Sequence, residues 1–445
     1  MDILTSPLLT DLYQLTMLQG YVEEELFDEA VFEFYVRQMP KNRSFLVAAG
    51  LESCLAFLEN MAFSDEEILY LERTKRFSSA LIDYLKTLRF QGDVHALPEG
   101  TIFFPKEPLI RVTAPLPVAQ LVETRLINFL HFETLIASKA ARCVIAARGR
   151  ASLVDFGLRR AHGAEAGLLA ARASCLAGFI GTATVPADLS YGIPLFGTMA
   201  HSYVEVHADE ETAFFNFALA NPANVTLLID TYDTLKGARI AAKVAAKLAE
   251  RHIRVQAVRL DSGDLLSLSK AVRVILDSSG FPDIHIFASG NLDEFAVADL
   301  LAQGAPIDGF GIGTRLDTSD DVPYLECAYK LMEYAGVPRL KKSSGKITYP
   351  GRKQVYRTMR NNRMSGDIIA LEDESPVGVP LIMKVMDKGK RLRNRQSLPE
   401  LASYTAKQRA GLPPTLCQLT GTGFYPVRIS DALIRLKEET ERRLV

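Results

Sequence analysis

The sequence predicts an α/β fold: an irregular TIM-like α/β barrel in the middle of the chain, with a composite β-rich domain formed by the N- and C-terminal segments. Six short apolar runs each end in polar or glycine residues, and several are separated by Ala- and Leu-rich stretches of helical length. This alternation is typical of a parallel sheet covered by crossover helices. Nearer the start of the chain, short apolar runs broken by Pro and Gly predict further strands, and from about residue 340 the pattern is basic and again strand-like.

The first predicted element is a helix over residues 10–23, where apolar positions recur at helical spacing and Thr10 is the expected N-cap. Strands are expected over Glu29–Val36 and within Val94–Val112. Residues 117–147 have a helical composition and lead into the barrel. These elements belong to an N-terminal α+β segment over residues 1–145.

The barrel is expected over residues 146–339, followed by a C-terminal segment over 340–445 that packs with the N-terminal segment. Its six strand-forming runs are Ser152–Gly157, Gly178–Thr182, Thr226–Asp233, Ala257–Asp264, His285–Asn291 and Gly309–Thr314. In such folds the ligand lies at the carboxyl ends of the strands. The candidate functional residues should therefore come from the ends of these runs.

Composition favours a small-molecule ligand. With 51 Lys and Arg residues against 53 Asp and Glu, the chain has no basic excess for nucleic acid or an anionic membrane surface. Its longest uncharged stretches are broken by Pro and Gly and fall short of the ~20 residues that a spanning helix needs. The five cysteines form no CxxC pair, which indicates reduced thiols in a cytoplasmic protein.

Carboxylates follow two of the predicted strands. Asp261 and Asp264 share a turn with a serine and a glycine, and Asp230 ends the preceding run. Such groups can hold a divalent cation, ribose hydroxyls or a developing positive charge. Asp264 and Asp233 are equally well explained as caps of the helices that follow. For Asp230 and Asp261 we favour a functional role.

Two glycine-bearing segments follow the last two strands. Backbone N–H groups in such loops can bind a phosphate at a helix N-terminus. Each segment alone has a steric explanation as well, because glycine allows close packing. Together they favour a phosphorylated ligand; the residues concerned are Gly290, Asn291, Gly311, Gly313 and Thr314.

Three further residue types could contact a ligand. His201 lies among small neighbours and is a candidate general base or phosphoryl acceptor. Phe156 could stack on a planar ligand, while Arg159 or Arg259 could pair with a carboxylate or phosphate. The alternative is that Phe156 belongs to the core and that both arginines form surface ion pairs.

Together these motifs resemble the nicotinate phosphoribosyltransferase family, the type II phosphoribosyltransferases of NAD biosynthesis. The resemblance covers nearly the whole chain in the family's order. The matching segments are Thr10–Met17, Phe45–Leu51, Asp155–Arg160, Gly197–Ser202, Leu228–Asp233, Arg259–Asp264 and Gly351–Tyr356. As a set they are specific, whereas any one of them alone would not be.

The resemblance implies that nicotinate and phosphoribosyl pyrophosphate are converted into nicotinate mononucleotide and pyrophosphate. ATP would be a co-substrate, hydrolysed to ADP and phosphate and coupled through a phosphohistidine at His201, as in an ATP-dependent ligase. Thr198 and Arg259 would hold nicotinate, and Tyr13 of a neighbouring subunit would stack on the ring opposite Phe156. A homodimer with shared active sites is therefore expected.

The resemblance also implies roles for phosphate, metal and charge. Gly290 and Thr314 match the positions that bind the 5′-phosphate. Asp261, with Asp230 as a second candidate, would stabilise positive charge on the ribose, and Mg²⁺ would be held with Asp261 and Asp264.

Ala183 favours a carboxylate substrate over an amide, since the related nicotinamide enzymes are expected to carry an acidic residue at this position. The rival interpretations are a nicotinamide or quinolinate phosphoribosyltransferase, a lyase or isomerase barrel that uses the same phosphate loops, and a non-catalytic sensor of pyridine nucleotides.

Overall fold

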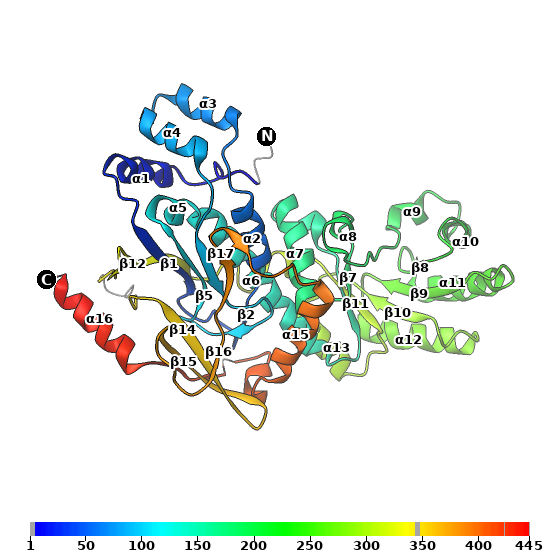
Figure 1. Cartoon of the computed structure of the whole chain (residues 1–445). Helices are drawn as coiled ribbons and strands as arrows, with labels where there is room; N and C mark the ends of the chain where they lie inside the picture. Colours follow the sequence, from blue (N-terminus) through cyan, green and yellow to red (C-terminus); the bar gives the residue numbers. More distant parts are fainter. Residues whose placement is uncertain (1–4, 343–347, 422, 445) are drawn as a thin grey trace. The chain divides into compact units, whose positions relative to one another are not determined.

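The computed structural model describes residues 5–342, 348–421 and 423–444. The chain divides into two compact units (Figure 1). The first unit comprises Met1–Ser138 with Tyr324–Val445, and the second comprises Lys139–Pro323. Each unit has its own sheet and its own apolar core, so each is described separately.

The second unit is built on six parallel strands in the order β7-β6-β11-β10-β9-β8. The strands are β6 (Ser152–Asp155), β7 (Gly181–Thr182), β8 (Val225–Leu228), β9 (Val255–Leu260), β10 (His285–Ala288) and β11 (Gly309–Ile312). All six predicted runs therefore contribute a strand to one sheet. The predicted TIM-like arrangement is confirmed as an open half-barrel, with β7 and β8 at its two ends.

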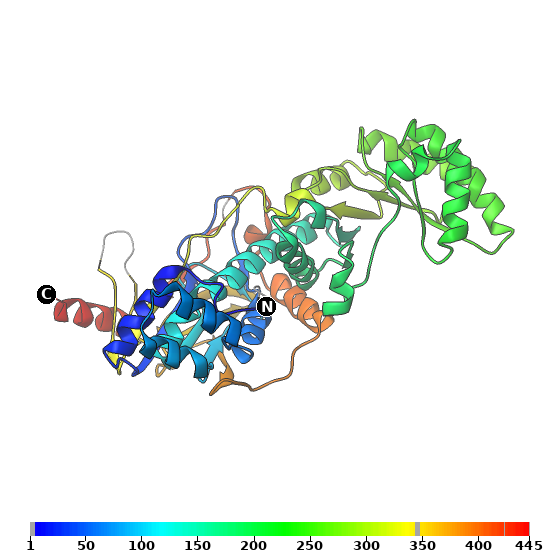
Figure 2. The same cartoon turned by 90° about the horizontal axis from the view of Figure 1, so that it is seen from above.

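Helices follow the strands of this unit. Figure 2 shows α10, α11 and α12 in green beside the strands that they cover. The alanine-rich face of α11 is buried, since Ala238, Ala241 and Ala245 are inaccessible or nearly so. The helices are α7 (Ala164–Ala177), α8 (Pro186–Tyr191), α9 (His201–Glu205), α10 (Glu210–Ala220), α11 (Thr234–Ala249), α12 (Leu265–Ser278), α13 (Glu294–Ala302) and α14 (Thr314–Asp317), with a 3₁₀ turn, η1 (Leu158–Arg160).

The first unit contains a seven-stranded sheet in the order β13-β12-β1-β5-β3-β17-β18. Its strands are β1 (Glu29–Val36), β3 (Asp93–Ala96), β5 (Pro108–Pro115), β12 (Cys327–Tyr334), β13 (Val337–Pro338), β17 (Met383–Asp387) and β18 (Lys390–Arg391). Because β17 pairs with β3, strands from both ends of the chain share this sheet. The predicted composite β-rich domain is thereby confirmed.

Two smaller sheets complete the first unit. One has the order β16-β14-β15-β19, and the other pairs β2 with β4. Their strands are β2 (Leu46–Val47), β4 (Ile102–Phe103), β14 (Lys353–Arg360), β15 (Arg363–Leu371), β16 (Val379–Pro380) and β19 (Val427–Ile429).

One expected boundary requires correction. We placed the end of the barrel at residue 339, but β12 pairs along its whole length with β1 of the first unit. Ala328, Tyr329 and Met332 of this strand are buried there, and the Tyr329 ring stacks on Phe32 at 5.0 Å between centroids. The apolar residues of β12 therefore belong to the β-rich core.

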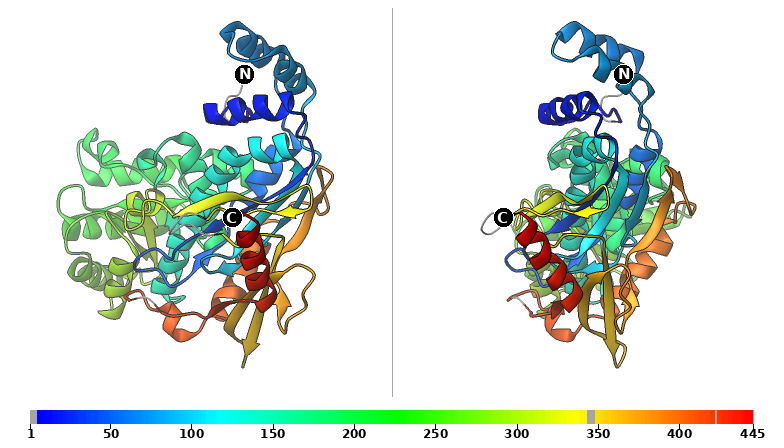
Figure 3. Two further views of the ribbon diagram at one scale, coloured as in Figure 1. Left: turned by 90° about the vertical axis from the view of Figure 1, so that its left-hand side faces the viewer. Right: turned by 60° about the vertical axis from the view of Figure 1, so that its left-hand side comes forward.

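The helices of the first unit include a group near the start of the chain. In Figure 3 the blue helices α3 and α4 lie together beside α1, in agreement with their contacts. The helices are α1 (Leu12–Glu23), α2 (Leu51–Glu59), α3 (Asp65–Thr74), α4 (Ser79–Thr87), α5 (Leu116–Leu121), α15 (Leu398–Ala410) and α16 (Asp431–Arg443), with a 3₁₀ turn, η2 (Pro414–Cys417). Helix α6 (Glu123–Ala147) spans the sequence boundary between the units.

The expected cap of the first helix is wrong by one residue. Asp11 occupies the N-cap of α1, and Thr10 instead donates a hydrogen bond to Thr124 at 3.1 Å. Among the described residues, none of the five cysteines forms a disulfide. Within the described ranges, no helix is both long enough and apolar enough to cross a membrane.

Candidate active site

A cavity of about 410 Å³ lies in the second unit, beside the carboxyl ends of β6, β7 and β9. It is lined by Phe156, Leu158, Arg159, Ala183, Gly197, Thr198, Met199, Ala200, His201, Arg259 and Asp261. Seven of these are residues that the sequence analysis selected: Phe156, Arg159, Ala183, Thr198, His201, Arg259 and Asp261. The cavity therefore brings residues at strand ends together with Thr198 and His201, which lie in none of the predicted strands.

Phe156 forms an aromatic wall of the cavity. Its backbone N–H donates to Ile312 O at 2.9 Å, which extends the pairing of β6 with β11. Its ring packs over Gly311, where a Cβ atom would lie 2.4 Å from the ring carbon Cδ2. At Gly313 a Cβ atom would lie 2.8 Å from Phe156 O. Close packing against Phe156 therefore accounts for both glycines, which is the steric explanation left open above.

Arg259 is the buried cation of the cavity. Its side chain is 14% exposed, and its Nη1 donates to Thr198 Oγ1 at 2.7 Å. The closest carboxylate oxygen, Asp261 Oδ1, is 4.0 Å from Nη2, and the buried Nε has no hydrogen-bond partner among the described residues. Burial lowers the pKa of Arg259, with the charges of Asp261 and Asp230 acting in the opposite direction. An anionic ligand would compensate this desolvated charge.

Asp230 and Asp261 connect the ends of neighbouring strands. Asp230 Oδ2 accepts hydrogen bonds from the Asp261 backbone N–H and from Ser262 Oγ, each at 2.8 Å. Asp261 Oδ1 accepts from Ser289 Oγ at 2.5 Å, which adds the end of β10. Asp230 Oδ1 is buried and has no hydrogen-bond partner in the described part of the chain. Carboxylate oxygens at this edge are thus held in fixed positions.

His201 is the first residue of α9 and is half-buried. Its Nδ1 lies 3.1 Å from Thr231 Oγ1. A hydrogen bond at one ring nitrogen fixes which nitrogen carries the proton and leaves the other for chemistry. Sequence reasoning did not select Thr231, although it directly follows Asp230 at a strand end.

Asp264 and Asp233 are helix caps, as the structural alternative predicted. Asp264 Oδ1 accepts from the backbone N–H groups of Leu266 and Ser267 at 3.1 and 3.3 Å, and its Oδ2 accepts from Ser267 Oγ at 2.6 Å. Asp233 Oδ1 accepts from Lys236 N at 2.7 Å. Within the described ranges no group of three or more His, Cys, Asp or Glu side chains could hold a metal ion. A cation here would need ligand oxygens from substrate or water.

The predicted phosphate-loop residues are not among those that line the cavity. Gly290 has φ +97°, and a Cβ atom there would lie 2.0 Å from Asp261 O, so the two strand ends approach closely. Asn291 Oδ1 accepts from Arg315 Nε at 3.1 Å. Thr314 is the exposed first residue of α14.

Tyr13 belongs to the first unit. It lies on α1 and is 47% exposed, and its hydroxyl donates to Glu123 Oε2 at 3.3 Å. The ring therefore has a free surface within its own unit.

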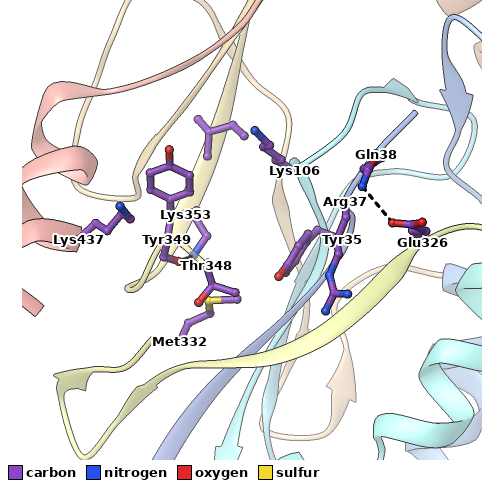
Figure 4. A pocket seen from close by; sticks show the side chains of 11 residues that line it. Tyr35, Arg37, Gln38, Lys106, Glu326, Met332, Thr348, Tyr349, Lys353 and Lys437 are labelled. Carbon is purple, nitrogen blue, oxygen red and sulfur yellow. Dashed lines mark hydrogen bonds between the residues drawn. The ribbon is translucent and has the colours of Figure 1, made fainter. Parts of the chain in front are cut away.

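The first unit has a cavity of its own, of about 430 Å³, which sequence reasoning missed (Figure 4). Cationic and tyrosine side chains surround it, and the segment from residue 348 to 353 supplies part of its wall. Lys353 is already paired, since its Nζ lies 2.8 Å from Glu33 Oε2 and donates to Tyr349 O and Gly351 O. None of the site residues selected from the sequence lines this cavity.

Comparison with known proteins gives a consistent family. Models described as the nicotinate phosphoribosyltransferase N-terminal domain, family and C-terminal domain match residues 8–131, 151–372 and 377–437. The chain is 47% identical over 429 residues to nicotinate phosphoribosyltransferase pncB2 of Mycobacterium tuberculosis, covering 96% of this chain and 92% of that protein.

Solved structures agree at the level of the whole chain. The crystal structure of human nicotinic acid phosphoribosyltransferase matches with TM-score 0.85 and 29% identity, covering 97% of this chain and 99% of that one. Nicotinate-nucleotide pyrophosphorylase from Pyrococcus furiosus matches with TM-score 0.75 and 25% identity, covering 92% and 96%.

Proposed function

Because the chain belongs to the nicotinate phosphoribosyltransferase family, we propose that it condenses nicotinate with phosphoribosyl pyrophosphate. In this reaction the pyridine nitrogen forms a bond to the ribose anomeric carbon as the bond to pyrophosphate breaks. The products are nicotinate mononucleotide and pyrophosphate, which places the enzyme in NAD biosynthesis from nicotinate. The observation that carries this proposal is the buried Arg259 guanidinium, which has too few anionic partners of its own.

Arg259 and Thr198 are the proposed carboxylate site. A guanidinium can bind a carboxylate through two parallel hydrogen bonds, and the bond from Thr198 already orients it. Phe156 offers its ring as a stacking surface, and Arg159, exposed on η1, supplies a second positive charge at the rim. Ala183 contributes no negative charge to the same cavity. These features favour nicotinate over the neutral nicotinamide.

Asp261 and Asp230 are the proposed groups that stabilise the ribose as pyrophosphate leaves. Positive charge develops on the sugar ring at that moment, and fixed carboxylates lower its energy. Their hydrogen bonds to Ser289, Ser262 and the Asp261 backbone hold them without further rearrangement.

Mg²⁺ is the proposed metal, and its chemistry would be to neutralise charge on the diphosphate. The cation keeps several waters and takes only one or two protein carboxylates together with substrate oxygens. Asp261 fits this requirement, and the unpartnered Asp230 Oδ1 makes Asp230 a better second ligand than Asp264, whose oxygens cap α12. The 5′-phosphate is assigned to the backbone around Gly290 and Thr314.

His201 is the proposed acceptor of the ATP γ-phosphoryl group. With Nδ1 bonded to Thr231, Nε2 is the nitrogen that would attack phosphorus, which would release ADP and form phosphohistidine. Water later hydrolyses that bond to give phosphate. The added negative charge can organise the metal and substrate more tightly than a neutral ring can.

The test of the coupling measures nicotinate mononucleotide formation with and without ATP for the wild type, His201→Ala and His207→Ala. His207 is a matched control that follows the same helix, α9, and its Nδ1 is bonded to Tyr203 O. We expect ATP to raise the rate of the wild type and of the control but not that of His201→Ala. Full ATP stimulation of His201→Ala would contradict the phosphohistidine. If the wild type bound nicotinate mononucleotide but formed no product, the alternative of a non-catalytic sensor of pyridine nucleotides would be favoured instead.

A further inference from the structure

Two buried carboxyl groups lie behind the aromatic wall of the cavity. Asp155, the last residue of β6, is fully buried, and its Oδ1 accepts from the Gly157 backbone N–H at 2.8 Å. Its Oδ2 accepts from Thr182 Oγ1 at 2.6 Å, on the neighbouring strand β7. Asp155 thus holds the backbone on both sides of Phe156 and ties it to the residue that precedes Ala183.

Asp317 is the second carboxyl group. It ends α14 and is fully buried, and no N–H or O–H donor in the described residues reaches either of its side-chain oxygens. The group is packed directly on Gly157, where a Cβ atom would lie 2.1 Å from Asp317 Cγ. Gly157 has φ −96°, so space rather than backbone conformation requires glycine at this position. Both carboxyl groups therefore meet at Gly157, since Asp155 accepts from its backbone N–H and Asp317 packs on its Cα.

The pair is stable only if it carries a proton. An ionised carboxylate in an apolar interior without donors is strongly unfavourable, and two adjacent carboxylates repel each other as well. Asp155 has two donors and can remain ionised, whereas Asp317 has none. Burial and the charge of Asp155 raise the pKa of Asp317 well above its usual range, and burial also raises the pKa of Asp155.

We propose that Asp317 is a positioning residue whose protonated carboxyl group donates to Asp155, so that the pair fixes Phe156 and Ala183 around the pyridine ring. This inference rests on the proposed function. It adds a hydrogen bond between α14 and β6 to the chain of contacts that defines the cavity. Thr182 continues that chain, because its backbone pairs with Pro194 O and with Phe196 N–H at the start of the segment that carries Thr198.

Other titratable groups around the pair do not take over this role. Burial, together with the charge of Asp155, raises the pKa of the Cys175 thiol on α7 to about 12, so this thiol stays neutral. Arg159 and Arg160 of η1 are exposed. On α7, which packs against α14, Arg172 lies over the Tyr191 ring.

The test compares Asp317→Asn, which keeps a donor but cannot ionise, with Asp317→Ala, which has no donor. Asp299→Asn and Asp299→Ala are matched controls on the exposed face of α13. At neutral pH we expect Asp317→Asn to keep the KM for nicotinate within about threefold of the wild type. Loss of the donor in Asp317→Ala should raise that KM about tenfold or more while kcat changes much less. An unchanged KM in Asp317→Ala, or an equal loss in both variants, would overturn the positioning role.

A second measurement needs no catalysis. A group whose folded-state pKa is raised binds more protons when folded, so its contribution to stability falls as pH rises toward that pKa. Urea unfolding followed by circular dichroism, since the chain has no Trp, should show the wild type losing stability relative to Asp317→Asn between pH 5.5 and 8.5. A difference that stays constant with pH would overturn the shared proton. Should the wild type make no nicotinate mononucleotide, the proposed function fails while this measurement still decides the carboxyl pair.

Discussion

At the scale of single residues, the cavity combines a buried positive charge with neighbouring carboxylates. Arg259 is buried beside Thr198, and the acidic groups Asp261 and Asp230 lie at the strand ends next to it. A substrate with a carboxylate at one end and a developing positive charge at the other is complementary to this arrangement. The distribution of charge within the cavity therefore supports a pyridine carboxylate that reacts with a ribose.

Ala183 gives the sharpest residue-scale prediction. An Ala183→Asp substitution should lower kcat/KM for nicotinate about tenfold or more. The new carboxylate would repel the carboxylate of nicotinate by a few kcal/mol in the partly buried cavity, and about 1.4 kcal/mol is enough for a tenfold effect. Ala183→Asn, similar in size but uncharged, is the control and should lose less activity. Steady-state kinetics of both variants measure the effect. If Ala183→Asp stays within about twofold of the wild type, Ala183 does not face the substrate carboxylate.

Residues with chemical side chains at strand ends could be selected from the sequence. Phe156, Arg259 and Asp261 were found this way, whereas His201 was selected for its small neighbours; all four line one cavity. Asp317 could not be found, because it follows the last strand in a segment that resembles a phosphate loop. Its significance depends on contact with Asp155 and Gly157, which only the folded chain brings together.

At the scale of elements, the six strands were predictable because each apolar run changes sharply to polar or glycine residues. The first and last residues of the helices were less predictable. Thr10 and Asp11 are both good capping residues, and local sequence alone does not decide between them. The strand β12 directly follows the strands of the second unit in sequence and, like them, contains apolar residues. Its partner is nevertheless β1, near the other end of the chain.

Asp264 provides the element-scale prediction. As the cap of α12 it should matter for stability, whereas Asp261 should matter for catalysis. We expect Asp264→Ala to lower the unfolding midpoint while the Mg²⁺ requirement stays within about twofold of the wild type. Asp261→Asn should instead reduce kcat about a hundredfold or more.

The pH dependence of the cap has a definite sign. Hydrogen bonds from Ser267 lower the pKa of Asp264, so its contribution is present above the unfolded-state pKa and is lost as pH falls through the folded-state value. The stability difference between the wild type and Asp264→Ala should therefore disappear in acid. A Mg²⁺ requirement that rises strongly in Asp264→Ala would restore this residue as a metal ligand.

At the scale of the whole molecule, the sequence indicated a β-rich unit made from both ends of the chain, and the pairing of β3 with β17 has this form. What the sequence could not indicate is which strands pair with each other within each sheet. That depends on packing among residues far apart in sequence, such as Phe32 with Tyr329. The cavity of Figure 4 escaped prediction for the same reason, because its cations come from both ends of the chain.

The proposed shared active site is tested by mixing subunits. Tyr13→Ala and Arg259→Ala should each be nearly inactive as homodimers, because one lacks the stacking ring and the other the carboxylate site. Co-expression should restore up to about a quarter of wild-type activity, since half of the dimers would carry one intact site of two. Equal mixtures that stay inactive, although the chains are shown to associate, would contradict a Tyr13 supplied by the partner.

The most direct measurement of the central claim supplies purified protein with phosphoribosyl pyrophosphate, Mg²⁺ and ATP, together with nicotinate, nicotinamide or quinolinate in separate reactions. Mass spectrometry then identifies each product. Our account predicts nicotinate mononucleotide and pyrophosphate from nicotinate, with far slower turnover of the other two substrates. Preferred use of nicotinamide or quinolinate, or no product from folded protein in any reaction, would contradict it.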